Sequence, residues 1–434
     1  MWLRIKRVLS NKTIMLRIAF TLLILLFVRI LANTTIPLVE INAVVDYIKN
    51  SDYFSILNSF SGSSLQNLSI MSLGITPYIT ASIGVQLLQM VIPKLKEYSE
   101  QGETGKQKLN KITRYMAIIL AFIQALALIL GLSTRGSLLR ASLEGSVVDN
   151  YRYLFYVYMA IVMASGTALA MWFASLITKK GVGNGSSLLI VAGIVTSLPT
   201  MMTALWSKYI INTTSGWSYV WFIVIILLYF GILFGVVYMQ IAQRKIPIQY
   251  ANRQGKSDSN IPMKLNVGGV IPVIFAQTVM SIPLSIVGAT TASDTLSLWF
   301  TNIFSTGKPI GFIVYVILII IFAFFYAFLQ ISPQKMSDNL SKSNSYIPGI
   351  RPGIDTQDYI ASLLFKITVI GTLYLVILAI LPIVTSLIFN FTSAEASAVR
   401  LGGTSLLIIV GVAIETTQQV ETDAAQNEYG SIFR

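Results

Sequence analysis

The chain has 434 residues, of which 54% are hydrophobic and only 11% are charged, whereas a soluble domain has about 25% charged residues. This composition excludes an ordinary soluble protein and indicates a polytopic membrane protein. The chain contains no cysteine and no histidine, which excludes disulfides, iron–sulfur clusters and thiol catalysis, and removes the usual metal ligand and general base.

Ten apolar segments follow one another along the chain, each near the length of about 20 residues that crosses a bilayer. The first begins directly after a basic N-terminal stretch and has full length, which is typical of a retained first helix rather than a cleaved signal peptide. An even number of spans places both termini on one side of the membrane. The predicted spans lie near residues 17–36, 73–92, 115–132, 153–177, 187–207, 218–239, 267–289, 310–331, 362–388 and 401–419.

The basic residues indicate which side is cytoplasmic. With a cytoplasmic N-terminus, 23 of the 31 lysines and arginines fall in cytoplasmic segments, seven fall in outer segments, and Arg29 lies within the first span. This asymmetry predicts that both termini are cytoplasmic, and it accounts for most of the formal charge of +13 without nucleic-acid binding. Two cytoplasmic loops, about 240–264 and 332–357, are long and basic, and either topology signalling or partner docking explains them.

The spans divide into an N-terminal half, residues 1–210, and a C-terminal half, residues 211–434. Each half holds five spans, so the two halves enter the membrane from opposite sides. If they are structural repeats, they are inverted about an axis in the membrane plane, with a functional site near the midplane between them. The predicted fold class is therefore an all-α polytopic membrane protein of ten transmembrane helices.

The segment Asp52–Leu68 lies between the first two spans on the outer side. It mixes apolar residues with many serines, and is too short and too hydroxylated to cross lipid alone. One interpretation is an exterior loop with a surface helix. The other is a re-entrant helix inside a cavity, because non-helical or half-length segments at membrane depth are tolerated only where protein or water surrounds them.

The acidic residues argue against ion-coupled transport and against catalysis. Ion-coupled transporters usually keep carboxylates inside the membrane, but here only Glu415 lies within a predicted span, near its cytoplasmic end. Arg29 is the one deep charge, near the outer end of its span, where it could snorkel. The GETGK string at Gly102–Lys106 lacks the spacing of a phosphate-binding loop. We therefore predict no enzyme, no cofactor and no metal, and an energy source outside this chain.

Six strings along the chain are specific enough to compare with known families. They are GITPYITASIGVQLL (Gly74–Leu88), GVGNGSSLLIVAGIV (Gly181–Val195), QRKIPIQYANR (Gln243–Arg253), KLNVGGVIPVIFA (Lys264–Ala276), YIPGIRPG (Tyr346–Gly353) and LGGTSLLIIVGVAIE (Leu401–Glu415). They resemble the SecY (Sec61α) family, the channel subunit of the protein translocase. They occur in the family's order and are spread over nearly the whole sequence.

The resemblance implies two five-helix halves, hinged between spans five and six, around an hourglass channel for unfolded polypeptides. It also implies that a short helix at about residues 52–68 plugs the outer funnel and need not satisfy lipid. The corresponding plug residues are Phe54, Leu57, Phe60, Ser61, Gly62 and Leu65.

The waist of the channel in this family is a ring of aliphatic side chains, which resists wetting yet deforms around an extended chain. Position 186 departs from the pattern because it is a serine, and the neighbouring Leu188 or Leu189 could compensate. The ring positions by resemblance are Ile75, Ile79, Ser186, Ile190, Ile274 and Ile408.

The family also opens sideways between spans two and seven, to release signal sequences and membrane helices into lipid. Ser82 and Gln86 on span two, and Gln277 and Thr278 on span seven, are uncharged polar residues at matching depths. We interpret them as lining this lateral gate, although such residues also serve as ordinary interhelical contacts.

The family's partners are the SecE and SecG subunits, the SecA motor ATPase and the ribosome, in the cell membrane. Arg351 matches a family arginine that is important for the motor, and two flanking prolines restrict the chain around it. Basic loops suit both acidic motor patches and ribosomal RNA. The predicted docking residues are Arg244, Lys245, Arg253 and Arg351.

Two other classes of protein remain to be weighed. A small-solute secondary transporter predicts a midplane carboxylate and shorter cytoplasmic loops. A membrane enzyme or insertase predicts a polar constellation within the spans. The sequence shows neither pattern, and it leaves open whether the channel is a housekeeping or an accessory copy.

Overall fold

The computed structural model describes residues 11–37, 39, 45, 61, 62, 64–133, 146–211, 217–250, 259–289, 294–305, 308–388 and 393–432. Helices dominate this part of the chain, and ten of them are long. The long helices are α2 (Lys12–Asn33), α5 (Thr76–Val91), α7 (Glu103–Ser133), α8 (Ser146–Lys180), α9 (Gly185–Trp206), α10 (Trp217–Ile241), α11 (Ile271–Ala289), α13 (Pro309–Gln330), α15 (Ile354–Ile388) and α16 (Ser393–Ile432). The shorter elements are α6 (Pro93–Glu100), α12 (Asp294–Phe304), α14 (Pro333–Lys342), a π-helical turn (Ser207–Ile211), and strands β1 (Gln243–Tyr250), β2 (Ser259–Lys264) and β3 (Ser345–Tyr346).

Each of the ten predicted spans coincides with one of these long helices. By length and hydropathy alone, six described helices are sufficient to cross a membrane, namely α2, α7, α8, α10, α13 and α15. Three of the other four are short or contain a proline: α5 has 16 residues, and α9 and α11 contain Pro199 and Pro283. Proline inside a membrane helix is tolerated where neighbouring helices surround it, which agrees with the inner positions of α5, α9 and α11.

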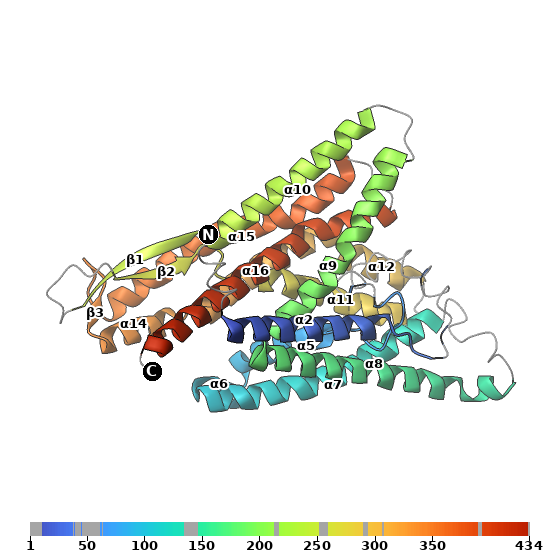
Figure 1. Cartoon of the computed structure of the whole chain (residues 1–434), viewed down its shortest axis with the longest axis horizontal. Coiled ribbons are helices and arrows are strands. Elements are labelled where there is room, and N and C mark those ends of the chain that lie inside the picture. Colours follow the sequence, from blue (N-terminus) through green and yellow to red (C-terminus); the bar gives the residue numbers. More distant parts are fainter. Residues whose placement is uncertain are drawn as a thin grey trace.

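Figure 1 shows how the long helices are arranged. Helices α2, α5, α7 and α8 form the lower side in that view, α10, α15 and α16 form the upper side, and α9 leans from one to the other. Contacts of α9 with α16, and of α11 with α7 and α5, join the halves. The arrangement leaves the centre to α5, α9, α11 and α16.

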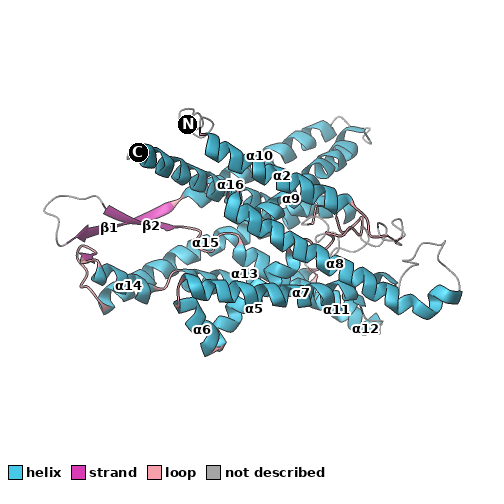
Figure 2. Cartoon of the chain, turned by 60° about the horizontal axis from the view of Figure 1, so that its bottom comes forward, coloured by secondary structure: helices cyan, strands magenta, loops and turns pink. Residues whose placement is uncertain are grey.

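A small three-stranded sheet lies beyond one end of the helices (Figure 2) and was not predicted from the sequence. Strand β1 pairs antiparallel with β2 and also with β3, giving the order β2-β1-β3. The alternation of Ile246 and Ile248 buries one face of β1 over α15 and α14. The two long basic loops therefore form one body, because β1 and β2 come from the first loop and β3 from the second.

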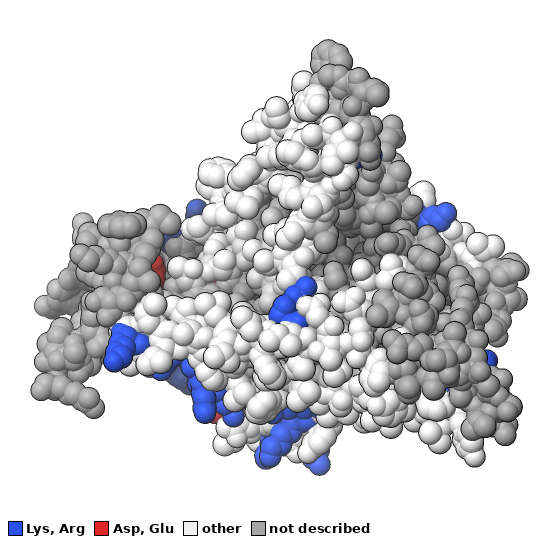
Figure 3. Space-filling model, turned by 45° about the vertical axis from the view of Figure 1, so that its right-hand side comes forward, with Lys and Arg blue, Asp and Glu red and all other residues white. Residues whose placement is uncertain are grey.

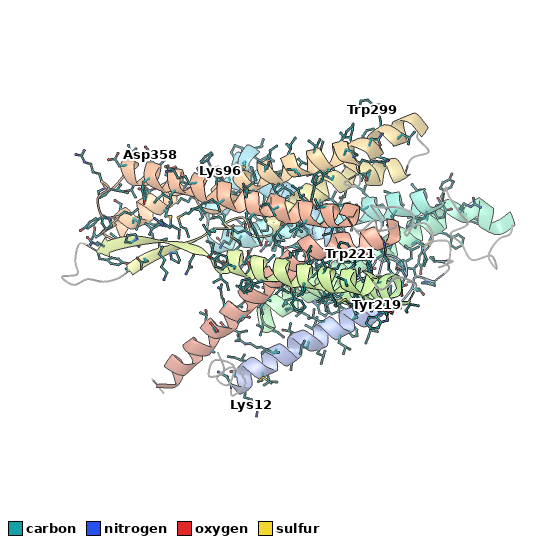
Figure 4. All side chains as sticks on the ribbon, turned by 90° about the horizontal axis from the view of Figure 1, so that it is seen from above. Lys12, Lys96, Tyr219, Trp221, Trp299 and Asp358 are labelled. Carbon is teal, nitrogen blue, oxygen red and sulfur yellow. The ribbon has the colours of Figure 1, made fainter. Side chains whose placement is uncertain are left out.

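Figure 4 labels residues at both ends of the molecule. Lys12, Lys96 and Asp358 lie toward the end that carries the sheet, whereas Trp299 and Tyr219 lie toward the other end (Figure 4). Lysine and arginine side chains gather along one border of the surface in Figure 3, and most of the remaining described surface there is uncharged. This distribution is typical of a protein with a basic cytoplasmic side and an aromatic interfacial belt.

A close approach inside the N-terminal half gives a first testable prediction. A Cβ at Gly166 on α8 would overlap the carbonyl group of Ile70, so Gly166→Ala must force the two backbones apart. We expect a loss of about 1–3 kcal/mol in stability, measured as a lower Tm of the detergent-solubilised protein. Gly231→Ala on α10 is the control, because a Cβ there meets no atom within 4 Å; equal Tm values for the two variants would contradict the close contact.

Candidate functional site

A mainly apolar cavity of about 110 Å³ lies at the centre of the helices. Five of the six predicted ring residues line it, and they come from four helices: Ile75 and Ile79 at the start of α5, Ile190 on α9, Ile274 on α11 and Ile408 on α16. Residues from motifs that are far apart in the sequence thus line the same cavity.

The five isoleucines are also packed against one another through shared clusters. Ile190, Ile274 and Ile408 belong to one apolar cluster with the buried Ile194. Ile75, Ile79 and Ile190 belong to a second cluster that includes residues of α2 and α8. Ile190 is common to both clusters, so the side chains form a connected apolar constriction rather than separate patches.

Ser186 does not line the cavity, in contrast to the sequence prediction. Its hydroxyl donates to Asn184 Oδ1 at 2.7 Å, and its backbone N–H donates to the same oxygen at 3.1 Å. This capping contact holds Ser186 in the first turn of α9. Leu189, one of the two residues named as compensating, lines the cavity instead.

Described residues between Ser61 and Gly74 form part of the wall of the cavity. Ser61, Met71 and Gly74 contribute to its lining, while Leu65 is 1% exposed and packs in a core with α7 and α8. The described end of the predicted plug folds as turns, not as a helix, because side chains such as Ser64 bond to backbone carbonyls, here Met71 O at 3.0 Å. The other predicted plug residues, Phe54, Leu57 and Phe60, lie outside the described residues.

Arg29 contributes a positive charge to the otherwise uncharged lining. The sequence placed it where it could snorkel to the membrane surface, but its guanidinium turns inward and Nη1 donates to Gly62 O at 2.6 Å. Among the described residues that line the cavity it is the only charged one. No carboxylate is found among the described residues of the lining.

The predicted gate residues lie where α5 and α11 meet. Gln277 and Thr278 line the cavity, and Thr278 Oγ1 donates to Ile274 O within its own helix at 2.8 Å. Gln86 Oε1 is buried and accepts no hydrogen bond from any described residue. Ser82 lies on α5 one turn before Gln86 and is half-buried.

An apolar contact that the sequence prediction missed closes this seam. Ile83 of α5 is 5% exposed and packs in a cluster with Val273, Ala276 and Met280 of α11. Its spacing from Ile79 and Leu87 follows the period of a helix face, which is the signal that could have identified it. The seam between α5 and α11 is therefore shut by packing in this conformation.

Three of the four predicted docking residues are exposed at the end that carries the sheet. Arg244 and Lys245 stand on β1 opposite Met263 and Pro262 of β2. Arg351 follows β3, and its backbone carbonyl accepts a hydrogen bond from Thr356 Oγ1 at 2.7 Å, so its backbone is fixed while its side chain is exposed. Arg253 lies outside the described residues.

The two loops are tied together near these basic residues. Gln249 pairs with Tyr346 across β1 and β3, and Tyr346 OH donates to Gln249 Oε1 at 3.1 Å. The exposed Arg244 and Lys245 on β1, and Arg351 after β3, are therefore held near one small sheet.

Comparison with known proteins agrees with this architecture. The sequence model of the SecY family matches residues 69–417. The protein translocase subunit SecY of Staphylococcus carnosus is 41% identical, over 97% of this chain and 96% of that protein.

Two solved structures share the fold. A SecY protein whose plug domain stabilises the closed state of the translocation channel superposes with a TM-score of 0.62, at 18% identity over 93% of this chain and 91% of that one. Sec61 in the canine ribosome–channel complex from the endoplasmic reticulum gives 0.57, at 16% identity and the same coverage of both chains. The extent of the family match and the identity to the staphylococcal subunit together show that this chain belongs to the SecY family.

Proposed function

We propose that this chain is the channel subunit through which unfolded polypeptides cross the membrane. The observation that supports it is the constriction of five isoleucines from four helices, with described residues between Ser61 and Gly74 in the wall of the same cavity. An apolar constriction resists wetting by water and ions, and it adapts to a passing chain without binding its peptide groups. In this proposal the ring, the plug and the gate residues each have a separate role in the same transport cycle.

The division into two halves supports lateral release of hydrophobic segments. In this proposal the halves, residues 1–210 and 211–434, move about a hinge between α9 and α10. Separation of α11 from α5 then opens a path from the cavity to lipid, past Ser82, Gln86, Gln277 and Thr278. The contact of Ile83 with α11 is the packing that must be broken.

Partners supply the energy and complete the assembly. The lining of the cavity offers no ion-coupling carboxylate among its described residues, so a motor or a translating ribosome must drive the substrate. The exposed Arg244, Lys245 and Arg351 suit the acidic surfaces of SecA and of ribosomal RNA. The SecE and SecG subunits follow from family membership and accompany the channel in the membrane.

The distribution of charge supports a location in the cell membrane with both termini in the cytoplasm. The start of α2 and the end of α16 lie near each other, because Arg17 Nη1 and Asp423 Oδ2 form an ion pair at 3.2 Å. Both lie toward the end that carries the sheet (Figure 1). That end is the one with the basic residues, as the positive-inside rule requires.

Charge reversal at Arg351 tests the docking proposal. We expect Arg351→Glu to abolish ATP-driven transport of a secretory precursor into proteoliposomes, because the charge that faces the motor is inverted while the fixed backbone of the loop is kept. The measurement is the protease-protected precursor, together with recovery of the assembled complex. Lys308→Glu, an equally exposed reversal at the N-cap of α13 on the opposite side of the membrane, is the control. Normal transport by Arg351→Glu would remove the docking assignment.

A further inference from the structure

Gly62 sits in a tightly enclosed place beside Arg29. Its φ of +65° lies in the left-handed region, and a Cβ there would lie 2.7 Å from Arg29 Nη1, 2.7 Å from Thr196 Oγ1 and 2.9 Å from Gly193 Cα. Only glycine fits this combination of backbone and space. The turn therefore brings the Gly62 carbonyl directly to the guanidinium, at the 2.6 Å given above.

The far end of the same segment is held in a different way. Ile36 N–H donates to Leu68 O at 3.0 Å, and Ile70 N–H donates to Thr34 O at 3.2 Å. The close approach of Gly166 to Ile70 adds a backbone contact with α8. Residues 68–70 are thus joined by backbone hydrogen bonds to the chain that follows α2. Gly62, in contrast, accepts a hydrogen bond from the side chain of Arg29, which can rotate away.

We propose that Arg29 is a positioning residue that latches the plug segment in its closed place, with Gly62 as its receptor and Thr196 and Gly193 of α9 as the walls. The inference rests on the proposed channel function. Opening then consists of the loss of the Arg29–Gly62 hydrogen bond and a movement of Gly62 away from α9, while residues 68–70 stay in place.

The surroundings make this contact strong when closed and easy to release during transport. In an apolar cavity a hydrogen bond from a charged donor is stronger than in water. When a substrate enters, water and peptide carbonyls reach the guanidinium and replace Gly62 O. The latch is therefore weakened by the arrival of the substrate itself.

The test uses the absence of native cysteine in the chain. Ser61→Cys places a single thiol on the plug segment beside the latch, and a membrane-impermeant maleimide added from outside reports its exposure. We expect Arg29→Gln to raise the labelling rate by about tenfold, which corresponds to the loss of one hydrogen bond from a charged donor. The labelling rate of Arg29→Lys should lie between those of the unchanged arginine and Arg29→Gln, because an ammonium keeps the charge but lacks the planar fork of a guanidinium.

Two controls separate the latch from general loss of charge or strain. Arg17→Gln removes another arginine of α2, which pairs with Asp423 outside the cavity, and should leave labelling unchanged. Gly62→Ala should open the plug as Arg29→Gln does, whereas Gly74→Ala, which also has positive φ (+53°) but meets no atom closer than 3.9 Å, should open it less. The double variant Arg29→Gln/Gly62→Ala should open no further than either single variant.

Ion conductance of the same variants in planar bilayers distinguishes the possible failures. If removal of residues 52–68 produces conductance but Arg29→Gln changes neither conductance nor labelling, the latch is refuted and the channel stands. If neither variant conducts, the plug assignment fails and the latch with it. Additive effects of Arg29→Gln and Gly62→Ala would also overturn the latch, because they would act through separate contacts.

Discussion

Removal of residues 52–68 is expected to turn a sealed membrane protein into an ion leak. The described end of this segment forms part of the wall of the cavity: Ser61 is in the lining, and Leu65 is 1% exposed. Without the segment, the isoleucine constriction alone separates the two solutions, and thermal fluctuation of its side chains admits water. We expect the conductance of the reconstituted protein in planar bilayers to rise by at least about tenfold.

The deletion needs evidence that the bundle survives. The long helices should keep their helical circular dichroism, because the deleted residues lie between α2 and α5 and belong to neither. Shortening another outer connection, residues 134–145 between α7 and α8, is the control and should leave the membrane sealed. Unchanged conductance after deletion of residues 52–68 in a correctly folded protein would refute the plug assignment.

Two isoleucines one turn apart on α9 allow the sealing of the channel to be tested separately from the stability of the fold. Ile190 lines the cavity, whereas Ile194 does not and is 1% exposed in a packed cluster. We expect Ile190→Asn to increase ion leak with little loss of stability, because its amide faces a space that water can enter. We expect Ile194→Asn to lower stability by about 3–5 kcal/mol, because it removes packed methyl groups and buries an amide.

The two variants are compared in one preparation, with conductance in bilayers and Tm in detergent as readouts. Opposite rankings in the two assays are the expected result. Equal leak from both variants, or a larger fall of Tm for Ile190→Asn, would mean that Ile190 is a packing residue and that the constriction lies elsewhere.

The ten helices could be predicted because length and hydrophobicity suffice for a membrane span. The constriction could not be derived in this way, since an isoleucine such as Ile274 looks the same in a helix interface as in a channel wall. Its place came from the resemblance of the surrounding strings. At Ser186, where the chain departs from the family pattern, the side chain bonds to Asn184 and lies outside the lining of the cavity.

The structural features that the sequence did not predict have physical causes. The sheet escaped notice because β1 contains Pro247 and basic residues in a short run, and its partners lie 11 or more residues away in the chain. The plug was expected to be helical, but its described residues, 61, 62 and 64–68, fold as turns, which hydroxyl groups and the left-handed Gly62 favour. The inward direction of Arg29 depends on a carbonyl 33 residues away, which no local pattern contains.

The shared middle strand has a mechanical consequence. Hydrogen bonds of an antiparallel ladder run perpendicular to the strands, so a load applied along β1 shears all of its bonds to β2 and β3 at once instead of unzipping them one by one. We therefore expect a push by a docked partner on either loop to reach the ends of α10 and α15 through the sheet, which would act as a stiff lever rather than as a tether.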